Sequence, residues 1–238
     1  MKSFISEDDI EQAICNRLSL PEYGWKRIEC DARVEAQDDV STTGRANPSE
    51  CILPDVFLAA LKRLNPQVEE GVLQGILRNF RKDYTATDMV ETNYKLYNQL
   101  RNGIKKPVRK NGKEDFDIVR LIDFDHPERN DFHCVNQMWI KGHYRYRRPD
   151  VLLFVNGLPV VFIELKNSTV KVEESYNKNL TSYRKDIPNI FSFNQICVLS
   201  NGLQTKIGAW NSRYEFFFEW LRVDNEKEKL DREQIAEH

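Results

Sequence analysis

The most constraining stretch of this 238-residue sequence is RRPDVLLFVNGLPVVFIELKN, which runs from Arg147 to Asn167. Two apolar runs flank Asn156-Gly157, a dipeptide typical of the tight turn in a β-hairpin. Runs that are apolar at nearly every position are expected for strands buried on both faces of a sheet. The stretch therefore predicts two neighbouring core strands, residues 151–155 and 159–165.

Charged residues interrupt this apolar pattern at both ends. Asp150 precedes the first run, and Glu164 and Lys166 lie at the end of the second. A buried ionised carboxylate is costly unless it is paired with a cation or bound to a metal. A cross-strand ion pair at a sheet edge is one explanation. The other is a divalent cation shared by the two carboxylates, with the lysine beside it.

The connection between the two strands decides which explanation is geometrically allowed. A two-residue turn pairs Val155 with Leu158 and sends Asp150 and Glu164 to opposite faces, because a slip of one residue flips every side chain. A three-residue loop, 156–158, places Asp150 directly opposite Glu164, with Cβ atoms about 4.5–5.5 Å apart. Lys166 shares the face of Glu164, because it lies two residues further along the strand. We predict the three-residue loop or an equivalent bulge.

Such a carboxylate pair suits a hard cation. Mg²⁺ prefers oxygen ligands and uses one or two protein carboxylates together with water and substrate phosphate. The bound ion polarises a phosphate and lowers the pKa of a water, and a nearby ammonium orients that water or stabilises developing charge. We therefore predict a Mg²⁺ site at Asp150 and Glu164, in which Mn²⁺ can substitute. The histidines show no zinc-ligand spacing.

The remaining sequence predicts one α/β domain with a mixed sheet. Ser6 and Asp9 form an acidic variant of the capping box at the start of a helix over 6–18. Residues 31–50 read as loop with some strand, and 54–102 as three helices, the second with Pro66 in its first turn. Strand-like runs follow over 115–165, then a helical pattern over 170–188 and further strands around 194–200, 204–210 and 214–223. The charged end, 222–238, reads as a tail or linker.

Composition limits the class of protein. The chain is 40% apolar and 30% charged, and it contains no apolar run of the ~18 residues that a membrane span needs. Its five scattered cysteines favour reduced thiols in a cytoplasmic protein. A net charge of −2 gives no overall footprint for nucleic acid, so any DNA site must be a local patch.

The spacing of the acids also matches a known signature. Arg-Pro-Asp, thirteen residues and then Glu-Leu-Lys fits the PD-(D/E)xK nuclease pattern, which is weak by itself. The flanking segments NDFHCVNQMWIKG, NLTSYRKDIPNIF and VLSNG resemble the N-terminal nuclease domain of type I restriction enzyme R subunits, over most of residues 1–221. The resemblance implies a restriction-endonuclease-like core with an inserted helical segment at 54–102, and Mg²⁺-dependent hydrolysis of DNA.

Residue by residue, the resemblance assigns the family's catalytic aspartate, glutamate and lysine to Asp150, Glu164 and Lys166. It assigns an acid on the first helix to Glu11, with Glu7 as the alternative. A Gln-x-x-x-Tyr motif corresponds to Asn179 and Tyr183, which share a helix face. Asparagine keeps the amide of the family's glutamine but has one methylene less reach. Double-stranded DNA, a methyltransferase subunit and a specificity subunit are the implied partners.

Two basic runs are candidate DNA contacts. KGHYRYRR leads directly into Asp150, and its cations are positioned to hold a DNA backbone near the site: Lys141, Arg145, Arg147 and Arg148. The alternative is a solvated loop. The run from Lys105 to Lys113 reads more simply as a solvated hairpin.

The chain lacks the G-x-x-x-x-G-K-[ST] phosphate loop of an ATP-driven motor. We therefore expect a nuclease domain alone, with any ATP dependence belonging to the full-length subunit. Two alternatives remain open at this point. One is a nuclease-like module that binds DNA or a partner without cutting in isolation. The other is a stand-alone repair or recombination nuclease, which the flanking segments disfavour.

Overall fold

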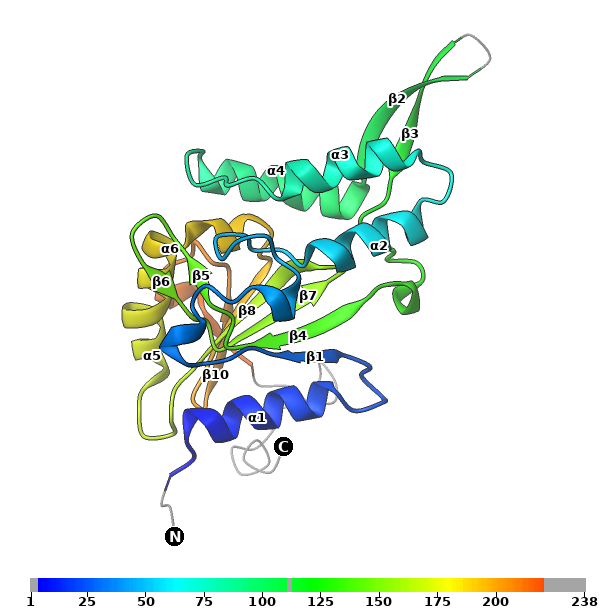
Figure 1. The fold of residues 1–238 in the computed structure, drawn as a ribbon. Helices are drawn as coiled ribbons and strands as arrows, with labels where there is room; N and C mark the ends of the chain where they lie inside the picture. Colours follow the sequence, from blue (N-terminus) through cyan, green and yellow to red (C-terminus); the bar gives the residue numbers. More distant parts are fainter. Residues whose placement is uncertain (1–3, 111–112, 221–238) are drawn as a thin grey trace.

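The computed structural model describes residues 4–110 and 113–220, which form a seven-stranded mixed sheet with helices on both faces (Figure 1). The strand order is β1-β4-β7-β8-β9-β10-β11. β1 is parallel to β4 and β8 is parallel to β9, whereas the other neighbours are antiparallel. The strands are β1 Lys26–Glu29, β4 Phe132–Asn136, β7 Val151–Val155, β8 Leu158–Leu165, β9 Ile196–Ser200, β10 Thr205–Gly208 and β11 Phe218–Glu219. The expected α/β class with a mixed sheet is confirmed.

The helices follow the predicted pattern closely. They are α1 Glu7–Leu18, α2 Pro54–Leu64, α3 Glu70–Phe80, α4 Met89–Asn102, α5 Val172–Glu174 and α6 Thr181–Asp186, with a π-helical turn at Ser175–Leu180. The capping box of Ser6 and Asp9 opens α1 as expected. Gly103 ends α4 with a φ of 74°. The expectation for Pro66 was wrong, because α3 begins only at Glu70 and a turn closed by the Val68 N–H to the Asn65 carbonyl intervenes.

The β7–β8 hairpin combines both connections that the sequence allowed. Its turn has two residues, since Val155 pairs with Leu158, and Asn156 and Gly157 both have positive φ. The three-residue loop was therefore wrong. A bulge then shifts the register, so that Leu153 pairs with Val161 and Val160 is the extra residue. The pairing of Val151 with Ile163 continues to Asp150 and Glu164, which face each other as predicted.

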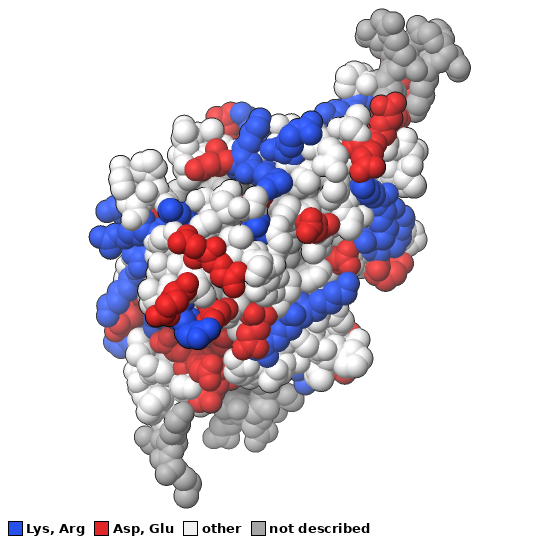
Figure 2. All heavy atoms as spheres, viewed as in Figure 1, with Lys and Arg blue, Asp and Glu red and all other residues white. Residues whose placement is uncertain are grey.

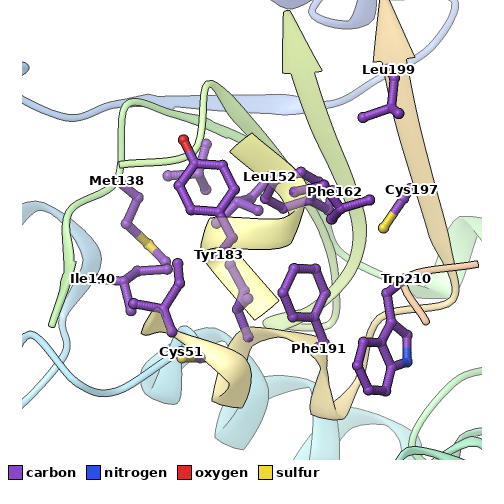
Figure 3. Close-up of a cluster of buried hydrophobic side chains, with 14 of the residues drawn as sticks. Cys51, Met138, Ile140, Leu152, Phe162, Tyr183, Phe191, Cys197, Leu199 and Trp210 are labelled. Carbon is purple, nitrogen blue, oxygen red and sulfur yellow. The ribbon is translucent and has the colours of Figure 1, made fainter. Parts of the chain in front are cut away.

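The two central strands are buried on both faces. Val151, Leu153 and Ile163 pack against Ile10 and Cys15 of α1. Their neighbours along each strand, Leu152 and Phe162, join the larger cluster on the opposite face, beneath α6 (Figure 3). This alternation places Asp150 and Glu164 on the α6 face, because each lies two residues from Leu152 or Phe162.

A separate helical layer covers one end of the sheet. α2, α3 and α4 share a second core with Leu158 of the hairpin and Phe193 (Figure 1). Gly157 lies directly beneath α2, where an added Cβ would be 2.5 Å from the Leu53 carbonyl oxygen. The helices of 54–102 therefore brace the turn of the hairpin whose other end carries the acids. No helix in the described ranges is both long and apolar enough to cross a membrane.

Several local expectations need correction. β1 was not expected, and residues 31–50 contain the 3-10 turns Val34–Ala36 and Ser41–Thr43 in place of strand. The run 131–140 breaks into β4 and β5 (Ile140–Lys141), which pairs with β6 (Tyr146–Arg147). The run from 214 gives a 3-10 turn, Tyr214–Phe216, before β11. β2 (Ile104–Lys110) and β3 (Lys113–Val119) form the expected hairpin, which projects from the body (Figure 1). The predicted tail, 222–238, lies outside the described residues.

Candidate active site

Asp150 and Glu164 meet at the end of the hairpin that is distant from its turn. Asp150 directly precedes β7, and its Oδ2 accepts the Leu165 N–H at 2.7 Å. Glu164 lies within β8 with 1% of its surface exposed. The bulge at Val160 places both carboxylates on one face, and the backbone of the neighbouring strand orients the first of them.

The two carboxylate oxygens of Glu164 have different environments. Oε1 accepts from Lys166 Nζ at 3.3 Å and from the Asn179 amide. Oε2 is buried and accepts no hydrogen bond from any described residue. A buried acceptor without a donor is unusual in a folded protein. One oxygen is therefore held by the protein, and the other is free to bind a cation or a donor.

The helical segment after β8 delivers the remaining predicted groups. Asn179 lies in the π-helical turn, and its side-chain amide donates to Glu164 Oε1. Tyr183 of α6 packs its ring against Phe162, with ring centroids 5.4 Å apart (Figure 3). Its hydroxyl donates to the Arg148 carbonyl at 3.3 Å. The two residues do share one helix face, as predicted from their spacing.

Burial and mutual repulsion set the protonation of the acids. Burial, with Glu7 and Glu11 nearby, raises the pKa of Asp150 to about 6 even though the Leu165 N–H and Lys166 oppose the shift. Burial and the neighbouring Asp150 raise the pKa of Glu164 well above its usual range. The pKa of Lys166 is raised, because Glu164, Glu7 and Asp150 outweigh its burial. The site therefore combines a protonated Lys166 with two carboxyl groups whose raised pKa values oppose ionisation.

Glu11 approaches from α1 on the other side of the sheet. Its Oε1 accepts from Asn136 Nδ2 at 2.8 Å and its Oε2 from the Gln137 amide. Glu11 and Asp150 both line a cavity of about 660 Å³ whose walls carry further acids, Glu7, Asp8, Glu29 and Asp31. Figure 2 shows Asp and Glu side chains gathered on the lower left of the face drawn, over the beginning of α1. The alternative first-helix acid, Glu7, also lines this cavity, and its carboxylate lies 3.7 Å from Lys166 Nζ.

The predicted DNA contacts do not all reach this cavity. Arg148 lines it, with its guanidinium 5.3 Å from the Trp139 ring centre and bonded to the Ala32 carbonyl at 2.9 Å. Arg147 is ion-paired to Asp186 at 2.5 Å on another side. Lys141 and Arg145 lie exposed on the β5–β6 hairpin, where Lys141 Nζ lies over the Tyr146 ring. Of the four predicted DNA contacts, Arg148 is thus the one that lines the acidic cavity.

Comparison with known proteins identifies the family. The profile described as type I restriction enzyme R protein N terminus matches residues 4–216. The chain belongs to this family. It is 31% identical over 233 residues to the type I restriction enzyme HindI endonuclease subunit of Haemophilus influenzae, covering 96% of this chain and 21% of that protein. It is 33% identical over 190 residues to the putative MjaIXP endonuclease subunit of Methanocaldococcus jannaschii, covering 76% of this chain and 18% of that protein. This R-protein N-terminal chain thus spans about a fifth of the length of these relatives.

The donor set of this R-protein N-terminal chain fits a hard divalent cation. Asp150 and the donor-free Oε2 of Glu164 are carboxylate oxygens, which Mg²⁺ prefers. Within residues 4–110 and 113–220, no three His, Cys, Asp or Glu side chains are grouped so as to hold one metal ion. A cation bound between Asp150 and Glu164 would have these two carboxylates as ligands, and water or phosphate would complete its shell.

Sequence reasoning missed two residues of this region. Asn136 and Gln137 bind Glu11, yet they appeared only as part of the flanking segment NDFHCVNQMWIKG. A polar Asn-Gln pair that interrupts an apolar run was the available signal. Two adjacent amides at the end of a buried strand need partners, just as Asp150 and Glu164 do.

Proposed function

We propose that this chain is the Mg²⁺-dependent DNA endonuclease domain of a type I restriction–modification R subunit, a type I site-specific deoxyribonuclease. The domain comprises residues 1–221 around a restriction-endonuclease-like PD-(D/E)xK core. Its relatives are named endonuclease subunits, and its opposed acids with an adjacent lysine suit phosphodiester hydrolysis. The observation that carries the proposal is the buried, donor-free Oε2 of Glu164 on the same face as Asp150.

Each side chain then has a role. Asp150 and Glu164 hold the Mg²⁺, for which Mn²⁺ can substitute, and the ion would polarise the scissile phosphate and acidify a water. Lys166, held between Glu164 and Glu7, orients the attacking water or stabilises charge on the phosphate. Asn179 fixes the orientation of Glu164, and Tyr183 packs against Phe162 of the same strand and ties α6 to the Arg148 peptide.

Double-stranded DNA is the proposed substrate. Arg148 is the best-placed phosphate contact, because Trp139 and the Ala32 carbonyl hold its guanidinium at the cavity wall. Lys141 and Arg145 would extend the contact along the backbone from the β5–β6 hairpin. Arg147 contributes through its pair with Asp186, which fixes the strand leading to Asp150. Methyltransferase and specificity subunits are the proposed partners, and ATP would act only in the full-length subunit.

A second candidate is a nuclease-like module that does not cut in isolation. The acidic cavity favours it, since six lining carboxylates face the single guanidinium of Arg148 among the described lining residues. Such a field repels phosphate until cations or partner surfaces compensate. This candidate keeps the same site and differs only in requiring the rest of the subunit for activity.

The test is plasmid nicking with Mg²⁺ or Mn²⁺, by the chain alone and by the complete subunit that contains it. We expect Lys166→Ala to abolish cleavage and keep the circular dichroism spectrum, whereas Lys95→Ala on the exposed face of α4 stays active. Cleavage by the complete subunit but not by the isolated chain would favour the second candidate. Full cleavage by Lys166→Ala in both settings would refute the assignment.

A further inference from the structure

Gln137 has an unusual backbone conformation directly beside the acids. It follows β4 with a φ of 59°, in the left-handed region that side chains rarely adopt. Among the described residues, Asn156 is the other non-glycine residue with positive φ, and it sits in the hairpin turn that requires this conformation. No such turn type explains Gln137, and strain of this kind concentrates at functional sites.

Gln137 links two of the acids through different groups. Its backbone N–H donates to the Asp150 carbonyl at 2.9 Å. Its side-chain amide donates to Glu11 Oε2, while the amide of Asn136 donates to Glu11 Oε1. Asp150 leads into β7 and Glu11 belongs to α1, so this one residue connects elements on both sides of the sheet.

The orientation of both amides follows from charge. A carboxylate only accepts hydrogen bonds, so each amide must turn its NH₂ group toward Glu11. The carbonyl oxygens, Asn136 Oδ1 and Gln137 Oε1, are consequently buried without a donor from the described residues. Two acceptors without donors and a strained backbone both cost free energy. What this arrangement achieves is a fixed position for the Glu11 carboxylate.

We propose that Gln137, assisted by Asn136, is a positioning residue of the nuclease site that holds the Glu11 carboxylate beside Asp150. The inference rests on the proposed function, because Glu11 and Asp150 are taken as parts of that site. Gln137 does not contact the cation or the DNA, and it acts through Glu11. A purely architectural role, attaching α1 to β4, instead predicts that a substitution changes Mn²⁺ affinity only to the extent that it changes the melting temperature.

The test compares Gln137→Gly with Gln137→Ala. Both remove the amide, but glycine accepts positive φ freely and alanine does not. We expect both variants to weaken Mn²⁺ binding about tenfold by titration calorimetry, as loss of outer ligand-orienting contacts does. We expect the melting temperature to fall only for Gln137→Ala. Mn²⁺ affinity that follows the melting temperature, with Gln137→Gly unchanged, would overturn the proposal in favour of an architectural role.

A double-mutant cycle tests whether the amide acts through Glu11. In a Glu11→Gln background we expect Gln137→Gly to change Mn²⁺ affinity and the rate of DNA cleavage by the complete subunit less than twofold. A full additional loss would overturn the proposal. The variant Asp150→Asn distinguishes failure of the positioning role from failure of the proposed function. If that variant loses Mn²⁺ binding while Gln137→Gly keeps it, only the positioning role fails, and if Asp150→Asn binds Mn²⁺ normally, the proposed function fails.

Discussion

Asp150 and Glu164 face each other because Val160 is an extra residue in β8. The turn at Asn156-Gly157 alone would send the two acids to opposite faces of the sheet. The bulge reverses that register, and the carbonyl of Val160 is satisfied by the Gln195 N–H at 2.8 Å. A local irregularity in one strand thus brings the proposed metal ligands together.

The turn of this hairpin is the first point to test. We expect Gly157→Ala to destabilise the protein by about 2 kcal/mol or more, because the new Cβ would collide with the backbone of α2 and the residue has a φ of 80°. Urea unfolding measures the change. Gly71→Ala, at an open position of α3, is the matched control and should be neutral or slightly stabilising. Equal stability of the two variants would contradict the packing described.

The acids should oppose stability in the absence of metal. The pKa of Asp150 is raised from 3.8 to about 6, so its favourable contribution is complete below pH 3.8 and is lost as the pH rises through 6. We therefore expect metal-free Asp150→Asn to exceed the parent protein at pH 8 by up to ~3 kcal/mol, and the gap to shrink toward pH 5. Thermal melts across this range measure it. A variant less stable than the parent at pH 8 would refute the electrostatic account.

Divalent cations should reverse that effect. A ligand that binds only the folded state raises its stability in proportion to RT ln(1 + [L]/Kd). We expect 10 mM Mg²⁺ or 1 mM Mn²⁺ (roughly 10–100 times the Kd expected of a two-carboxylate site) to stabilise the parent protein by about 1–3 kcal/mol at pH 8. The gain should diminish below pH 6, where Asp150 takes up a proton. Glu164→Gln should show no gain at any pH, and an undiminished gain in that variant would locate the cation elsewhere.

Asn179 should act through the orientation of Glu164. We expect Asn179→Leu to lower cleavage by the complete subunit about 10–100-fold, because it removes the donor to Glu164 Oε1. Asn179→Gln keeps an amide and should retain most of the activity. Thr181→Ala, at an exposed position of α6, is the control. Equal losses in Asn179→Leu and Asn179→Gln would show that the helix face, and not the amide, matters.

Arg148 should affect DNA affinity more than chemistry. Its loss removes one proposed phosphate contact, so binding should weaken for every DNA sequence and the slope of log K against log [salt] should fall by about 1. Fluorescence anisotropy at several salt concentrations, with Ca²⁺ in place of Mg²⁺, measures both. Arg145→Ala should have a smaller effect, because Arg145 lies away from the cavity. An unchanged slope in Arg148→Ala would remove this residue from the DNA interface.

Much of the fold was predictable because its signals are local. The capping box of α1, the three helices of 54–102 and the continuous apolar runs of β7 and β8 each depend on neighbouring residues. The bulge at Val160 was predictable only as an alternative, because the groups that bond its carbonyl, Asn194 Nδ2 and the Gln195 N–H, are distant in the sequence. β1 was missed since its half-exposed residues show no clear period.

Part of the candidate site was also predictable from the sequence. Asp150, Glu164, Lys166, Asn179 and Tyr183 come together as the spacing and the resemblance implied. The network of Glu11 with Asn136 and Gln137 was not visible, because residues 125 positions apart meet only after α1 docks on the sheet. The basic run before Asp150 was only partly informative. Charge alone does not show that Arg147 is paired with Asp186 while Arg148 faces the cavity.

The most direct test of the central claim is diffraction from crystals of the chain soaked in Mn²⁺, with data collected for anomalous scattering. The account predicts a peak between Asp150 and Glu164 Oε2, at about 2.0–2.3 Å from both carboxylates. The peak should be absent from Glu164→Gln crystals. If saturating Mn²⁺ gave no peak there, with or without DNA, the proposed catalytic centre would be contradicted.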